Sequence, residues 1–127
     1  MGTFIDYLSN PFQNIANTPA IILTAATHTL LVNGLIVCNR GERPIRFFLQ
    51  KARMESPPTG SIFLINQFLI DPYQTVDVVA KIGLQIVLQY SATPNLLIDS
   101  LICFTGGKTQ KIDCDISYTM LNDLPLS

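Results

Sequence analysis

The sequence has few charged residues and few of the side chains that usually carry catalysis. Charged residues make up 13% of its 127 residues, against about 25% in a typical soluble domain. It has no tryptophan and one histidine, His28. A serine- or cysteine-based catalytic centre would have to use His28, and no positioned base with an orienting partner is recognisable around it. We therefore expect a protein that is not an enzyme and that needs no cofactor.

The three cysteines, Cys38, Cys103 and Cys114, form an odd set without CxxC spacing. Each falls in a strand-like run, so we expect buried free thiols in a reducing compartment rather than disulfides or a metal site. The opening residues lack a basic-then-apolar pattern, and we expect no signal peptide. Polar residues interrupt every apolar run within about ten residues, which is too short for a membrane span.

The net charge is −1, which argues against direct nucleic-acid binding. The charge is unevenly spread: five basic residues face two acidic ones between Arg40 and Glu55, whereas three face six between Asp71 and Asp123. One interpretation is head-to-tail association of a basic and an acidic region. The other is that these residues are solvated strand faces that keep the protein soluble.

Hydrophobic residues make up 48% of the chain. A lone soluble domain normally keeps a charged, patch-free surface. We therefore expect other copies of this chain and other proteins to cover part of the exterior. A deeply packed sandwich with ordinary apolar exposure is the alternative.

Short runs with strand character, separated by turn residues, follow one another after Pro19. They predict a single antiparallel all-β sandwich at 20–127, jelly-roll-like with about eight strands, behind an N-terminal arm at 1–19. The expected strands are Ala20–Thr24, Thr29–Asn39, Pro44–Met54, Ile62–Ile70, Thr75–Ala80, Leu84–Tyr90, Leu97–Phe104 and Lys108–Met120. The arm has no sustained strand pattern, and Pro11 would end any helix that starts at Thr3.

Gly106 and Gly107 separate two of these strands. Paired glycines tolerate the positive φ angles of tight turns, so the pattern predicts a hairpin between Leu97–Phe104 and Lys108–Met120. Within the second strand, apolar Ile112, Cys114 and Ile116 alternate with polar residues, which predicts one buried face and one solvated face.

Ile62–Ile70 is apolar on both expected faces, with Phe63, Ile65 and Leu69 on one of them. A strand of this kind must be covered on both sides, either by the arm or by a neighbouring subunit. The residues that we predict at an interface are Phe4, Tyr7, Phe12, Arg43, Arg46, Phe63, Ile65 and Leu69.

Asp113 and Asp115 are the only carboxylates close together on one strand face. Their i, i+2 spacing places them ~7 Å apart, which would suit sugar chemistry or two calcium ligands. A third acidic partner is not evident, so a solvated face is the simpler interpretation. A ligand- or carbohydrate-binding sandwich module nevertheless stays open as the alternative function.

The run Val32–Gly41, in which a strand ends on Asn-Arg-Gly, resembles a motif of small β-sandwich structural proteins of tailed bacteriophages. Asp99-Ser-Leu101 and Ile116-Ser-Tyr118 with Leu121 are similar to later steps of that pattern, although Ile98 stands where the family has glycine. The resemblance covers roughly residues 20–122. It implies a non-enzymatic virion component of head-decoration, neck or tail-baseplate type, assembled in the host cytoplasm with copies of itself and other virion proteins.

Overall fold

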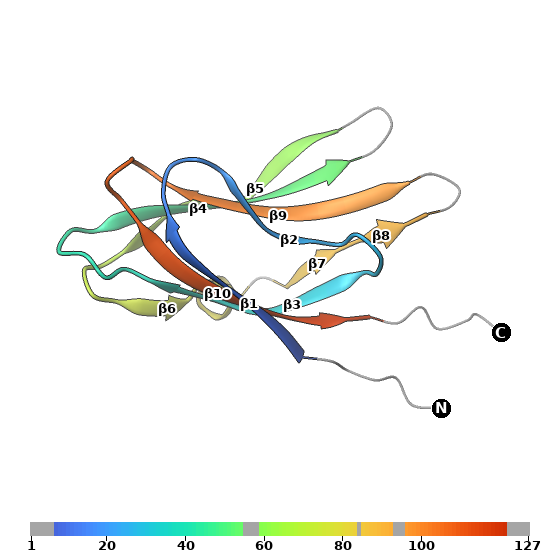
Figure 1. Cartoon of the computed structure of the whole chain (residues 1–127), viewed down its shortest axis with the longest axis horizontal. Coiled ribbons are helices and arrows are strands. Elements are labelled where there is room, and N and C mark those ends of the chain that lie inside the picture. Colours follow the sequence, from blue (N-terminus) through green and yellow to red (C-terminus); the bar gives the residue numbers. More distant parts are fainter. Residues whose placement is uncertain (1–6, 55–58, 84, 93–95, 122–127) are drawn as a thin grey trace.

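The computed structural model describes residues 7–54, 59–83, 85–92 and 96–121, and these residues form two antiparallel sheets packed face to face (Figure 1). Sheet A has the order β1-β10-β3-β6, with β7 also paired to β3. Sheet B has the order β2-β9-β4-β5, with β8 also paired to β9. The bounds are β1 Tyr7–Ile15, β2 Ala20–Thr24, β3 Leu30–Cys38, β4 Ile45–Met54, β5 Thr59–Ile70, β6 Thr75–Asp77, α1 Val78–Ile82, β7 Ile86–Leu88, β8 Tyr90–Ser91, β9 Leu97–Thr105 and β10 Ile112–Met120.

The strands pair in a nested order that defines the topology. β4 pairs with β5, β3 with β6 and β7, β2 with β9, and β1 with β10. The chain thus folds back on itself around the β4–β5 pair into a long double ribbon. This ribbon wraps into two sheets, one completed by the β3–β10 pair (sheet A) and the other by the β4–β9 pair (sheet B). This is a jelly-roll β-sandwich, and the predicted fold class is confirmed.

The core lies between the two sheets. Its largest fully buried side chains include Phe47 and Leu49 of β4, Leu35 of β3, Leu101 of β9 and Ile116 of β10. Every buried side-chain nitrogen or oxygen in the described part of the chain has a hydrogen-bond partner. No helix among these residues has the length and apolarity that a membrane crossing requires.

The described part of the predicted arm is a strand of the sandwich. β1 pairs with β10 from Tyr7↔Thr119 to Ile15↔Ile112, and Ile15 is buried. Pro11 is unusual in a strand, and Asn14 has a positive φ, so the sequence of this segment does not show a regular strand pattern. An edge strand tolerates both features because one of its sides needs no hydrogen-bond partners. The predicted boundary between an arm and a domain at residue 19 is therefore wrong, and β1 belongs to the domain.

The predicted hairpin at Gly106-Gly107 is also wrong. β9 lies in sheet B and β10 in sheet A, so the connection between them crosses from one sheet to the other. Neither glycine has a positive φ; among the glycines in the described residues only Gly83 does, where it ends α1. The sequence marks the turn correctly but does not say which sheet receives the next strand.

Three of the predicted strands differ from the observed ones in face or in extent. In β3 the buried set changes from Leu30 and Val32 to Leu35 and Val37, across a register shift opposite β10. The predicted strand Thr75–Ala80 ends at Asp77, where α1 begins, and the predicted strand Leu84–Tyr90 is divided into β7 and β8. Each β-bulge adds one residue and exchanges the inward and outward sides beyond it.

Candidate functional site

The outer face of sheet B carries an uncovered cluster of apolar side chains. Register places Phe48 opposite Phe104, and it places Ile102 and Phe63 on either side of Gln50. Ile21 of β2 and Leu69 of β5 extend the cluster toward both edges of the sheet. We call this surface the aromatic face; its members are Ile21, Phe48, Phe63, Leu69, Ile102 and Phe104.

Three phenylalanines from three strands form the centre of the aromatic face. The rings of Phe48 and Phe104 stack with centroids 4.9 Å apart and planes at 8°. Phe63 meets both rings edge-on, at 6.3 and 6.4 Å. These arrangements are favourable for aromatic rings, so the cluster is ordered before any partner arrives.

The aromatic face stays open to solvent. Ile21 is 61% exposed, Leu69 57% and Phe63 49%. Among the described residues that point outward from sheet B, Arg46 at one end is the only charged one. An ordered, nearly uncharged apolar surface of this kind is typical of a protein contact site.

The outer face of sheet A is polar and acidic instead. Asp113, Asp115 and Ser117 of β10 point outward beside Ser9 of β1 and Asp77 of β6. We call this surface the acidic face. Ile36 is its large exposed apolar side chain, at 47%.

Of the eight predicted interface residues, the structure places three on the outer side of sheet B. Phe63 and Leu69 belong to the aromatic face, and Arg46 lies at its end with its guanidinium against the carbonyl of Gly106 at 3.4 Å. Ile65 is 6% exposed and packs in the core, so the prediction that it shares a face with Phe63 and Leu69 is wrong. A bulge opposite Leu49 and Gln50 turns it inward.

The other predicted interface residues lie apart. Phe12 of β1 is half-buried against the core, and Arg43 is exposed in the β3–β4 connection. Tyr7 pairs with Thr119 at the start of β1, and Phe4 lies outside the described residues. The sequence pattern did not predict Phe48, Phe104, Ile21 and Ile102 at an interface. Their shared face becomes visible only when β2, β4 and β9 are known to be neighbours.

The residues considered for chemistry have structural partners. Asp113 binds Arg40 through one carboxylate oxygen at 2.9 Å and accepts the backbone N–H of Asn14 through the other at 3.1 Å. Asp115 is left exposed beside it. His28 shares a 2.9 Å hydrogen bond with the hydroxyl of Thr27. The described residues contain no group of three potential metal ligands.

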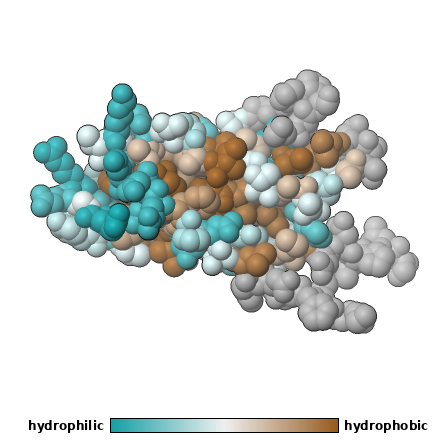
Figure 2. All heavy atoms as spheres, in the orientation of Figure 1, coloured by the Kyte–Doolittle hydropathy of each residue, from teal (hydrophilic) through white to brown (hydrophobic). Residues whose placement is uncertain are grey.

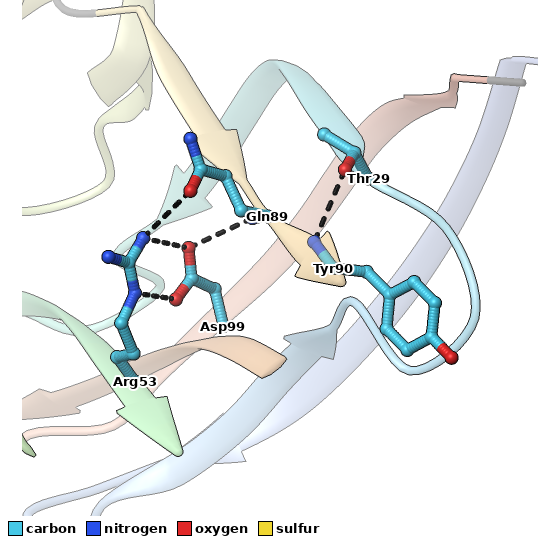
Figure 3. Close-up of polar contacts among 5 residues, drawn as sticks. All are labelled: Thr29, Arg53, Gln89, Tyr90 and Asp99. Atoms are coloured by element: carbon cyan, nitrogen blue, oxygen red, sulfur yellow. Dashed lines mark hydrogen bonds and ion pairs between the residues drawn. The ribbon is translucent and has the colours of Figure 1, made fainter. Parts of the chain in front are cut away.

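A buried ion pair between Arg53 and Asp99 stabilises the end of the sandwich opposite to Arg40 and Asp113 (Figure 3). The guanidinium of Arg53 binds both carboxylate oxygens of Asp99, at 2.8 and 3.2 Å, and also reaches the side-chain oxygen of Gln89 at 3.1 Å. The backbone N–H of Gln89 donates to Asp99 at 2.9 Å. Asp99 itself is fully buried, so this network joins β4, β9 and the residue between β7 and β8.

Opposing effects set the pKa of Asp99. Burial raises it, because desolvation disfavours the charged carboxylate. The hydrogen bonds from Arg53 and Gln89, together with the positive charges of Arg53 and Lys51, lower it, and the net pKa lies below its ordinary value. Asp99 is therefore a structural anion rather than a proton donor.

Two of the cysteines meet inside the core. Cys103 and Cys114 are both buried free thiols, one from each sheet, and Cys38 is a third free thiol that is half-buried. The hydrogen bond to Cys114 and burial both raise the pKa of Cys103. A thiol in this state is a poor nucleophile, because reactivity requires the thiolate.

By its fold and surface, the chain is a jelly-roll β-sandwich domain with one apolar outer face. No protein-family model matches the sequence, and no curated protein matches it. Among solved structures it is similar to a structure of infectious bursal disease virus, Gx strain, with 13% identity and a TM-score of 0.49, over 94% of this chain and 32% of that chain. This chain therefore spans about a third of the length of the chain it matches. At this score the likeness carries no conclusion about what this chain does.

Proposed function

We propose that this protein is a non-catalytic structural subunit that assembles by burying its aromatic face. The observation that carries the proposal is the ordered Phe48–Phe63–Phe104 cluster in a nearly uncharged, solvent-exposed sheet face. The first partner that we propose is a second copy of this chain. Two uncharged surfaces meet without charge repulsion, and their aromatic rings can interdigitate.

Physical magnitudes support such a contact. Apolar burial contributes roughly 25 cal/mol per Å², and a stable interface buries about 800 Å² on each partner. Most of the binding energy comes from a few central residues, which are often aromatic and surrounded by a polar rim. The aromatic face has this arrangement, with the three phenylalanines at its centre and Arg46, Thr24 and Ser61 at its margins.

The assembly that we propose is a virus particle. Jelly-roll sandwiches serve as viral capsid domains, although lectins and other proteins use the same architecture. The resemblance of Val32–Gly41 and Asp99–Leu101 to tailed-phage sandwich proteins supports the more specific proposal of a decoration, neck or tail-baseplate subunit. In that proposal the protein is assembled in the host cytoplasm, and further virion proteins join copies of this chain as partners.

Sedimentation velocity on a matched pair of variants tests the proposal. Phe63→Glu places a charge in the centre of the aromatic face. Ile36→Glu places the same charge on the acidic face, at a residue of similar exposure (47% against 49%). We expect wild type and Ile36→Glu to form the same oligomer and Phe63→Glu to remain monomeric, with unchanged circular dichroism in all three. A wild-type monomer at high concentration, or equal effects of the two variants, would refute the proposal.

The alternative, a carbohydrate-binding module that uses Asp113 and Asp115, has less support. Both carboxylate oxygens of Asp113 already have partners within the chain. A glycan array with Asp115→Ala as the control separates the two functions. Saturable sugar binding that this variant abolishes would favour the alternative.

A further inference from the structure

A cleft of about 910 Å³ lies at one end of the sandwich, where the β3–β4 and β9–β10 connections come together. Figure 2 shows hydrophilic side chains gathered at this end, in contrast to the apolar middle of the molecule. The cleft belongs neither to the aromatic face nor to the acidic face. Its walls are the loop from Asn39 to Ile45 and the turn from Thr109 to Lys111, and Asn14 also lines it.

A buried amide holds the first wall. Asn39 is fully buried, and its side-chain nitrogen donates to the carbonyls of Arg43 at 2.8 Å, Ile70 at 3.2 Å and Asp71 at 3.2 Å. Its side-chain oxygen accepts the backbone N–H of Gly41 at 2.9 Å. One side chain therefore fixes the loop that carries Arg43 to the neighbouring β5–β6 turn.

Polar contacts also hold the second wall. The hydroxyl of Thr105 lies 2.6 Å from the carbonyl of Gln110 and 3.2 Å from that of Gly107. The side-chain oxygen of Gln110 accepts the backbone N–H of Arg46 at 3.2 Å, which joins this turn to the start of β4. Both walls are thus ordered without a ligand, and such preorganisation lowers the entropic cost of binding.

The charges that line the cleft are mostly positive, and two of them are uncompensated. Arg40, Arg43 and Lys111 line it against a single acid, Glu42. Arg40 is neutralised by Asp113 at 2.9 Å. Arg43 and Lys111 make no ion pair with any residue in the described part of the chain. The fold thus holds two cations on opposite walls of one open cleft.

We propose that this cleft binds an oxyanion, a carboxylate or a phosphate group, between Arg43 and Lys111. The planar guanidinium of Arg43 can donate two parallel hydrogen bonds to such a group, and the ammonium of Lys111 supplies a point charge from the other wall. Thr109 and Gln110 add polar groups for neighbouring atoms of the ligand. This binding is independent of self-assembly through the aromatic face.

Calorimetric titration of the full chain tests the inference, with an oligoglutamate peptide and inorganic phosphate as separate probes. The variant Arg43→Gln/Lys111→Gln removes the two cations of the cleft that have no ion pair in the described part of the chain. The control Lys81→Gln/Lys108→Gln changes the net charge equally at two exposed lysines that do not line it. We expect one probe to bind saturably to wild type. Its affinity for the cleft variant should be lower by about tenfold for each of the two cations removed. The control should bind as wild type does.

The choice of probe identifies the source of the oxyanion. Tighter binding of oligoglutamate indicates an acidic protein segment, and tighter binding of inorganic phosphate indicates a phosphorylated ligand. The inference fails if neither probe binds saturably or if the control loses as much affinity as the cleft variant. It also fails if single-stranded oligothymidylate binds more tightly than both probes and responds equally to the two variants, because binding would then follow overall charge. None of these outcomes depends on the oligomeric state, so this test and that of the proposed function can fail separately.

Discussion

The two outer faces of the sandwich use their side chains in opposite ways. On the acidic face, polar groups bind within the molecule: Asp113 holds Arg40 and Asn14, and Asp77 caps α1. On the aromatic face, Phe63 and Leu69 remain about half-exposed, although their neighbours Ile65 and Ile70 on the same strand complete the core. The carboxylates with internal partners therefore stabilise the fold, and the surplus apolar residues remain available to a partner.

This contrast predicts that substitutions of internal charges lower stability and that substitutions on the aromatic face lower assembly. If the apolar surface had no role in assembly, substitutions on the aromatic face would leave assembly unchanged. The two properties can be measured independently, by denaturant unfolding and by sedimentation.

The largest loss of stability is expected at the buried ion pair. Arg53→Met keeps much of the length of the side chain but leaves the carboxylate of Asp99 buried without its charged partner. Removing one member of such a pair costs about 3 kcal/mol, measurable as a lower free energy of unfolding in urea. Lys51→Met on the same strand is the control and should change stability by less than about 1 kcal/mol. Equal losses in the two variants would show that the ion pair has no special role.

Among the substitutions of internal charges, the next largest effect is expected at Asp77 on the acidic face. One oxygen of its carboxylate accepts the backbone N–H groups of Val79, Ala80 and Leu35, at 3.1, 3.3 and 3.2 Å. Asp77→Ala leaves all three without this acceptor and should cost about 2 kcal/mol. Asp77→Asn retains an acceptor oxygen and should stay within about 0.5 kcal/mol of wild type. A loss in Asp77→Asn as large as that in Asp77→Ala would assign the effect to charge rather than to hydrogen bonding.

A smaller effect follows from the lowered pKa of Asp99. Because the folded state holds this pKa below that of the unfolded chain, the resulting stabilisation is complete above about pH 3.9. It is lost as the pH falls through the pKa of the folded state. Urea unfolding across this acidic range should show that wild type loses stability more steeply than Asp99→Asn. Parallel pH curves would contradict the role assigned to this carboxylate.

The sequence predicts most strands because their apolar alternation is local. β2, β3, β4, β5, β9 and β10 all lie within or close to the expected runs, and Ile112, Cys114 and Ile116 are buried as alternation requires. β1 was missed because an edge position removes the penalty for Pro11. A sequence pattern indicates only local preference. Whether a strand can contain proline depends on its position in the sheet, which the pattern does not show.

The aromatic face was only partly predictable for the same reason. Phe63 and Leu69 lie on one strand, and their exposure could be inferred from a strand that is apolar on both sides. Phe48 and Phe104 are 56 positions apart and meet only through the pairing of β4 with β9. Bulges in β5 then exchange the expected sides, which sends Ile65 into the core. The sequence predicted only a strand end at Asn39. Its four side-chain hydrogen bonds were not predictable, because they depend on loops that come together only in the folded molecule.

The smallest effect on stability is expected at Leu69 of β5, and its neighbour Ile70 provides the matched comparison. Leu69 is 57% exposed on the aromatic face, and Ile70 is fully buried beneath it. Leu69→Ala should change the free energy of unfolding by less than about 0.5 kcal/mol but weaken self-association about tenfold. Ile70→Ala should lower stability by about 3 kcal/mol through the cavity it leaves, and any of this variant that remains folded should self-associate normally. If Leu69→Ala destabilised the fold and left association unchanged, the outer side of β5 would be a part of the domain's own packing, and the assembly proposed for this face would lose its basis.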